Sequence, residues 1–315
     1  MMDNSSYIAS FILVPFKDMG NSKHVYFIAA LIAYLLMLTF NLSLILLILF
    51  EKSLHEPMYI FLCNLLICAL VGCTNFYIKL LIDLQTDVPV VSRLVCFTQI
   101  FFLYIYFSVE ITILTVMAYD RFIAINVPLL YSTIISYAKA LKLIILAWIY
   151  PICCVSILIS LSSSLKLCGN TINTVYCNNW EIVKLSCTDT SANNVYGSVA
   201  FGMFLLPILF ILYSYIKILV LCWNSSRSHK WKAFQTCLPH LVTFTFFLCS
   251  IVFEIIESRL RLKRTSDVVS TIASLESVII SPLLNPLIYG IILPEIRRRI
   301  IHVFFPGKKQ TLQHR

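Results

Sequence analysis

The sequence contains seven apolar blocks, each long enough to cross a lipid bilayer as a helix. Four of these blocks contain no Asp, Glu, Lys or Arg, and they cover residues 25–50, 58–78, 143–165 and 195–216. Three more each contain a single charged or titratable exception, namely Glu110 in 94–119, His240 in 233–253 and Glu276 in 268–293. A helix needs about 20 residues to span the hydrocarbon core, whereas a strand of a membrane barrel needs only about ten. The blocks therefore predict helices.

Composition agrees with a chain whose surface is covered by lipid. Only 12% of the residues are charged and the mean hydropathy is +0.88, whereas soluble domains carry about 25% charge. We therefore predict an all-α fold, a seven-transmembrane helix bundle with a short amphipathic helix after the seventh span. The expected organisation is an extracellular N-terminus over residues 1–24, the seven-span domain over 25–293 and a cytoplasmic segment over 294–315.

The orientation follows from the distribution of basic residues. If the C-terminus is cytoplasmic, fourteen of the 24 Lys and Arg residues lie on the inner side, and cytoplasmic loops are enriched in such residues. A cluster of four basic residues within 259–264 lies on the outer side and makes this inner excess smaller. We expect a multi-pass plasma-membrane protein with an extracellular N-terminus and the first span as an uncleaved signal anchor. The net charge of +9 then favours contact with anionic membrane lipid, not with nucleic acid.

Cysteine positions give independent support for this orientation. Eight of the 12 cysteines lie in or beside the spans, where a thiol packs as a small apolar group. The other four, Cys96, Cys168, Cys177 and Cys187, gather on the face already predicted to be extracellular. Thiols on one face suggest an oxidising compartment, and spacing alone leaves three pairings open. The sequon at Asn4 lies on the same side and is a predicted glycosylation site.

Two local patterns at the predicted inner face point to signalling. Asp120 and Arg121 end the third span, and an arginine at this depth needs a counter-charge unless it is a simple interfacial anchor. The seventh span contains Pro282 and Pro286, and each proline leaves one helical carbonyl without its donor. We expect a kinked helix there, with Asn285 satisfying a freed group.

Several segments together resemble the olfactory receptor family of rhodopsin-like G-protein-coupled receptors. They are LHEPMY at 54–59, MAYDRFIAI at 117–125, PLLY at 128–131, KAFQTC at 232–237 followed by HL at 240–241, SY at 214–215, and NPLIY at 285–289. The loop over residues 176–187 looks closest to bony-fish receptors. The resemblance implies a small-molecule odorant as ligand, a heterotrimeric G protein of the olfactory stimulatory type as partner, and neither enzymatic activity, cofactor nor metal.

The resemblance also implies site residues, which we state here as expectations. Those for G-protein coupling and activation are Asp120, Arg121, Tyr215, Lys232, Asn285, Pro286 and Tyr289. Those for the ligand pocket are Leu103, Tyr104, Phe107, Ser108, Val199, Met203, Phe204, Ile251, Val252, Ile255, Leu275 and Val278. The implied disulfides join Cys96 to Cys177 and Cys168 to Cys187, and the implied buried polar residues are Asn41 and Glu110. Such an apolar pocket fits an odorant held mainly by shape.

Two departures from the wider rhodopsin-like pattern are visible. Ala69 stands where most of these receptors have an aspartate, so a sodium site is in question, and Leu248 stands where an aromatic ring is common. An opsin would need a lysine in 268–293, and an amine receptor would need a carboxylate at position 103, which is Leu103 here. A transporter would be expected to show an internal repeat. The sequence has none of these features, which argues against all three classes. The alternative kept open is a rhodopsin-like receptor for a peptide or lipid. Ligand charge, G-protein class and oligomeric state stay open, as do the roles of Glu254 and Glu276.

Overall fold

The structure is a computed structural model that describes residues 8–17, 19–20, 22–223, 227–260 and 267–304. Within these ranges it leaves out the side chains of Lys17 and of residues 227–230, 232–233, 253–260, 267–277 and 303–304. The long helices are α1 Ser22–Phe50, α2 Pro57–Leu84, α3 Arg93–Asn126, α5 Tyr137–Ser163, α7 Ser191–Trp223, α8 Arg227–Leu260 and α9 Asp267–Ile292. The shorter ones are α4 Tyr131–Ile134, α6 Asn179–Lys184 and α10 Pro294–Phe304. Three 3-10 turns cover Val14–Lys17, Lys52–Leu54 and Pro128–Leu130.

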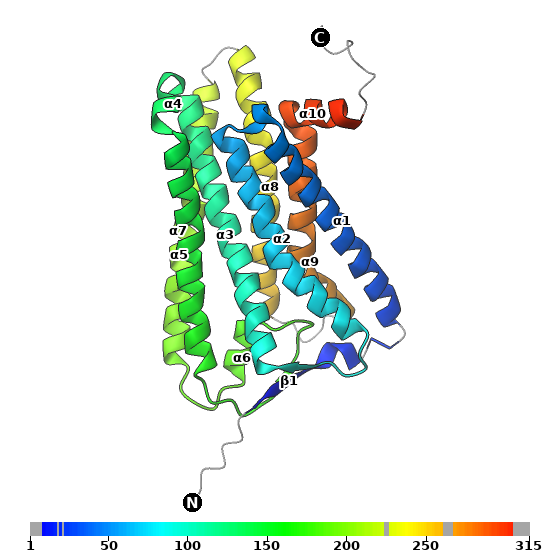
Figure 1. Cartoon of the computed structure of the whole chain (residues 1–315). Coiled ribbons are helices and arrows are strands. Elements are labelled where there is room, and N and C mark those ends of the chain that lie inside the picture. The colour runs from blue at the N-terminus through cyan, green and yellow to red at the C-terminus, as the bar shows by residue number, and fades with distance from the viewer. Residues whose placement is uncertain (1–7, 18, 21, 224–226, 261–266, 305–315) are drawn as a thin grey trace, which may run out of the picture.

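The seven long helices lie side by side as a bundle, and α10 turns away across one end (Figure 1). Six described helices are long and apolar enough to cross a membrane, and the seventh is reached when α9 is counted with α10 across a bend of 87°. The chain is thus a seven-helix membrane bundle with a C-terminal helix, which confirms the predicted fold. Several helices extend past their apolar blocks because helical hydrogen bonding continues where the chain leaves the hydrocarbon core.

Local chemistry fixes where several helices begin. The Ser92 hydroxyl accepts a hydrogen bond from the Val95 amide at 3.3 Å, and the Ser136 hydroxyl accepts one from the Lys139 amide at 3.3 Å. Each serine caps an amide that the first helical turn leaves without a carbonyl partner. At α2 the first helical residue is Pro57, whose missing N–H costs nothing at that position.

A small sheet covers the end of the bundle opposite α4 and α10, and we call this end the sheet end (Figure 1). Its strands are β1 Ser10–Leu13, β2 Val90–Ser92 and β3 Thr171–Ile172, in the order β2-β1-β3. Strand β1 pairs antiparallel with β2 and parallel with β3. Phe11 of β1 and Phe16 of the 3-10 turn that follows it are fully buried. Sequence reasoning missed this sheet because its strands are only two to four residues long.

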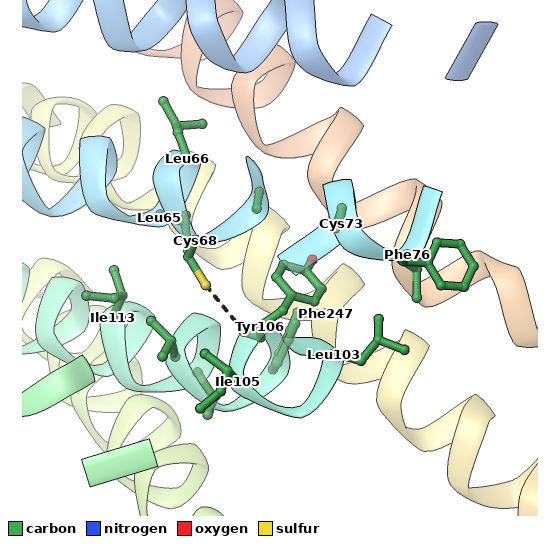
Figure 2. Close-up of a cluster of buried hydrophobic side chains, with 14 of the residues drawn as sticks. Leu65, Leu66, Cys68, Cys73, Phe76, Leu103, Ile105, Tyr106, Ile113 and Phe247 are labelled. Atoms are coloured by element: carbon green, nitrogen blue, oxygen red, sulfur yellow. Dashed lines mark hydrogen bonds between the residues drawn. The ribbon is translucent and has the colours of Figure 1, made fainter. Parts of the chain in front are cut away.

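Helices α2 and α3 pack closely in the core. Gly72 faces Tyr106 so closely that an added Cβ would lie 2.3 Å from the tyrosine Cβ, and small residues allow membrane helices to approach in this way. One turn away the Cys68 thiol donates to the Tyr106 carbonyl at 3.5 Å. Figure 2 shows Tyr106 from α3 among the buried α2 residues Cys68, Cys73 and Phe76, with Phe247 of α8 beside it.

This contact makes Gly72 a sensitive position. Gly72→Ala is expected to lower the thermal unfolding temperature of purified receptor, because overpacking a filled core costs about 1–3 kcal/mol. Gly202→Ala in α7 is the matched control, since no atom lies within 4 Å of its added Cβ. Equal unfolding temperatures for the two variants would show that α2 and α3 do not pack as described.

Candidate functional site

An ion pair between Asp120 and Arg121 lies at the α10 end of α3. The Arg121 Nε donates to Asp120 Oδ2 at 2.9 Å, and its Nη2 contacts the same oxygen. The Tyr131 hydroxyl donates to the other carboxylate oxygen, Oδ1, at 2.7 Å. Burial raises the pKa of Tyr131, and the charge of Asp120 raises it further, so the phenol keeps its proton. Asp120 is only 1% exposed, and Arg121 and Tyr131 each satisfy one of its two oxygens.

A second polar cluster lies between the helices beside this ion pair. The His240 Nε2 of α8 bonds to the Leu114 carbonyl of α3 at 2.8 Å. A carbonyl only accepts, so this nitrogen donates. The Tyr215 ring of α7 lies 5.3 Å from the His240 ring. The Tyr289 hydroxyl of α9 lies 3.3 Å from Thr243 Oγ1 of α8.

Tyr215 is only 4% exposed, yet its hydroxyl has no hydrogen-bond partner among the described residues. A buried hydroxyl without a partner is costly. The cluster therefore holds unused hydrogen-bonding capacity at a point where four helices meet.

Deeper in the bundle, the carboxylate of Glu110 joins α3 to α9. Glu110 Oε1 accepts from the Ser281 hydroxyl at 2.6 Å and from the Asn285 Nδ2 at 2.9 Å. Glu110 is 1% exposed. Buried carboxylates require such donors, and both come from the helix that contains the two prolines.

The structure corrects the expected role of Asn285. The carbonyl freed by Pro286 is that of Pro282, and it accepts from the Asn41 Nδ2 of α1 at 2.9 Å. The same Asn41 nitrogen also donates to the Met37 carbonyl at 2.8 Å. Asn285 is instead committed to Glu110. Sequence reasoning chose the nearest amide along the chain, whereas helix packing brings one from 241 residues away.

At the sheet end, two disulfides hold the long loop between α5 and α7. One joins Cys96 of α3 to Cys177 and the other joins Cys168 to Cys187. The Cys177 amide also donates to the Gln99 side-chain oxygen at 2.9 Å. The loop is therefore tied to α3 by a covalent bond and a buried hydrogen bond.

The residues expected to line a pocket separate into three groups. Leu103, Ser108 and Val278 are buried, and the partly buried ones are Tyr104, Phe107, Met203, Phe204 and Ile251. Val199 and Val252 are 53% and 51% exposed, and they lie off the buried stripes of α7 and α8. Helical periodicity directs these two outward, so the structure does not support them as pocket residues.

Other expected residues lie outside the described part of the chain. They are Asn4 and the side chains of Lys232, Glu254, Ile255, Leu275 and Glu276. Ala69 is buried within the core, and Leu248 packs against it. In the described residues, no group of three or more His, Cys, Asp or Glu side chains is arranged to hold a metal ion.

Sequence reasoning missed two features. Tyr131 was noted only as part of a motif, because its contact with Asp120 spans eleven residues. An ion pair between Lys79 and Asp83 in α2 was also missed, because the apolar block ends at residue 78. The spacing of four residues between opposite charges was the available signal for this pair.

Comparison with known structures identifies the class of fold. The chain is similar to squid rhodopsin, with a TM-score of 0.69 and 18% sequence identity, covering 90% of this chain and 86% of that one. The architecture is thus that of rhodopsin, a seven-helix membrane protein.

Sequence comparison then identifies the family. The family model "Olfactory receptor" matches residues 30–307. Relatives include human olfactory receptor 3A1, 35% identical with 94% of each chain covered. Human olfactory receptor 10A6 is 32% identical with 96% of each chain covered, and rat olfactory receptor 1 is 32% identical with 98% of each covered.

The chain belongs to the olfactory receptor family, and it is a receptor, not an enzyme. The alternative of a rhodopsin-like receptor from another family, for a peptide or lipid, gains no support from a family match that covers nearly the whole chain.

The Glu110 contacts predict a stability effect that depends on the replacement. Glu110→Ala leaves the Ser281 hydroxyl and the Asn285 amide unpaired, and each buried donor costs about 1–3 kcal/mol. Glu110→Gln keeps an acceptor oxygen and is expected to unfold closer to the wild type. Thermal unfolding of purified receptor measures both. If the two variants match the wild type, the hydrogen bonds from α9 to Glu110 do not stabilise the bundle.

Proposed function

We propose that this protein is an odorant receptor that binds a small molecule within the helix bundle and activates a heterotrimeric G protein at the α10 end. The observation that carries the proposal is the Asp120–Arg121–Tyr131 site beside the cluster of Tyr215 and Tyr289. Both lie where α3, α7, α8 and α9 approach one another. A site built from several helices responds to their relative movement, which a signalling receptor requires.

The proposed orientation places the N-terminus outside the cell and the α10 end in the cytoplasm, within the plasma membrane. Three features support it: the excess of Lys and Arg at the α10 end, the two disulfides at the opposite end, and the sequon at Asn4 on the disulfide side. The corresponding segments are residues 1–24, 25–293 and 294–315. Arg297 and Arg298 on α10 are exposed and suited to anionic lipid headgroups.

The proposed pocket lies between α3, α7, α8 and α9 toward the sheet end. Leu103, Phe107 and Phe204 supply apolar surface, and Ser108 supplies a hydroxyl. Such a lining suits a small organic odorant fixed by shape and one or two polar contacts. The side chains of Ile255 and Leu275 belong to this proposal through family resemblance alone.

The proposed mechanism is a shift between two helix arrangements. A ligand changes this equilibrium only by binding the active arrangement more tightly. At rest, Asp120 holds Arg121, and Tyr131 in turn holds Asp120. In the active arrangement α8 moves outward, Arg121 turns toward the Tyr215 hydroxyl and the G protein, and Tyr289 moves inward from the proline-containing end of α9. Lys232 then faces the G protein.

Family resemblance supplies two finer proposals. The first is that the partner is the olfactory stimulatory G protein, which raises cAMP. The second is that the loop over residues 176–187 is of the bony-fish type, although the relatives named above are mammalian.

Arg121→Ala tests the coupling proposal. The variant is expected to lose ligand-evoked cAMP almost completely, because no other described cation occupies this position, while surface expression stays near the wild type. Measurement is by cAMP reporter in cells with surface receptor quantified in parallel. Normal signalling at equal surface density would show that Arg121 is only an interfacial anchor.

Asp120→Ala tests the resting contact. Removing a charged hydrogen-bond partner costs about 1.5–3 kcal/mol, so the resting state is expected to lose about tenfold or more in population and basal cAMP is expected to rise. Tyr131→Phe, which removes only the 2.7 Å bond to Asp120, should raise it less. Unchanged basal cAMP in both variants contradicts the resting role of this ion pair.

A further inference from the structure

A partly buried ion pair near the sheet end of α2 is not used by the mechanism above. Lys79 Nζ contacts Asp83 Oδ1, one helical turn further along the same helix. The Lys79 side chain is 15% exposed and that of Asp83 is 4% exposed. Among the described side chains, no other charged group pairs with either of them. The apolar block of α2 ends at residue 78, so both charges lie just beyond it, toward the sheet end.

Helix stability alone does not explain this pair. Asp83 lies in the last turn of α2, where the helix dipole disfavours negative charge. The order is also the weaker one, because an acid four residues before a lysine stabilises a helix better than the reverse. Burial adds a desolvation cost to both charges. Three unfavourable terms at one pair indicate a role other than strengthening α2.

The pair lies on the side of α2 that faces the bundle interior. Lys79 follows Gly72 by seven residues, nearly two helical turns, and therefore shares its face. Gly72 faces Tyr106 of α3. Counting the same seven residues back along antiparallel α3 reaches Gln99, which is buried and bonded to the Cys177 amide.

The disulfide loop covers this same region of α2. The ring of Phe76, one turn before Lys79, lies 5.8 Å from the ring of Tyr176 in that loop. The charges thus sit on the interior side of α2, at the level of the loop that covers the sheet end.

We propose that Lys79 and Asp83 form a recognition site for a small zwitterion of the α-amino-acid type. The ligand carboxylate binds the Lys79 ammonium, and the ligand ammonium binds the Asp83 carboxylate. The inference rests on the receptor function proposed above and names a ligand class for it.

Charge balance selects a zwitterion over other ligands. A simple anion that binds Lys79 leaves the Asp83 carboxylate without a counter-charge. A simple cation that binds Asp83 leaves the Lys79 ammonium without one. An unpaired buried charge is strongly unfavourable. A zwitterion replaces one ion pair by two and leaves no charge alone. A neutral odorant makes no use of either group.

The first measurement is thermal stabilisation of the purified full-length receptor in detergent. The probes are L-amino acids with apolar side chains, the primary amines that lack their carboxylate, and the carboxylic acids that lack their ammonium. At least one amino acid is expected to raise the unfolding temperature, with its matched amine and acid binding about 30-fold more weakly or worse. If no amino acid stabilises the wild type, the proposal is wrong.

Variants then locate the binding. Lys79→Met and Asp83→Asn should each weaken amino-acid binding by about 30-fold or more. The doubly exchanged Lys79→Asp, Asp83→Lys receptor should recover part of the affinity. The matched control is Arg298→Met, which breaks an ion pair at the opposite end of the bundle and should bind normally. Unchanged affinity in the double variant Lys79→Met, Asp83→Asn would place the ligand elsewhere and overturn the proposal.

A cAMP assay separates this inference from the receptor function. Amino-acid binding to purified receptor with no cAMP response in cells would contradict the proposed coupling and leave the zwitterion site intact. A cAMP response to neutral odorants alone, with no stabilisation by any amino acid, would contradict the zwitterion site and leave the receptor function intact. Arg121→Ala should keep the stabilisation and lose the cAMP response.

Discussion

The requirement that buried polar groups find partners inside the bundle governs the contacts between its helices. Lipid offers no hydrogen bonds, so a polar atom within the membrane is costly unless the protein supplies its partner. Glu110 shows the consequence most directly, since Ser281 and Asn285 of α9 both donate to one of its oxygens. Asn41 of α1 follows the same rule, because it donates to the α9 carbonyl that Pro286 leaves free. Helix α9 is thereby fixed to both α1 and α3.

The two ends of the bundle are held by different kinds of bond. At the sheet end, two disulfides and a three-stranded sheet tie the long loop and the N-terminal strand to α3. At the α10 end, the contacts are hydrogen bonds and ion pairs around Asp120, His240 and Tyr289. Hydrogen bonds exchange partners readily, whereas disulfides do not. This asymmetry suits a protein that holds a ligand at one end and changes shape at the other.

Glu110 is satisfied by neutral donors, whereas two other buried carboxylates are satisfied by cations. Asp120 with Arg121 and Asp83 with Lys79 each place a carboxylate that is almost fully buried against a slightly more exposed cation. By contrast, the pair formed by Arg298 and Glu295 on α10 is exposed to solvent and contributes little to stability. The two buried pairs lie at opposite ends of the bundle, one beside the proposed G-protein site and one beneath the disulfide loop. In the two proposals above, a binding partner competes for the charges of each pair.

The sequence by itself determined the seven spans and the short helix that follows them, because the length of each apolar block is set by bilayer thickness. It also identified Asp120 with Arg121 and the two prolines near the end of α9, since adjacent charges and prolines are local signals. Only the tertiary structure decided that Tyr131 holds Asp120, that Asn41 serves the Pro282 carbonyl and that Val199 and Val252 point outward. These facts depend on helix rotation and on residues far apart in the chain, and periodicity cannot fix them when nearly every position of a span is apolar.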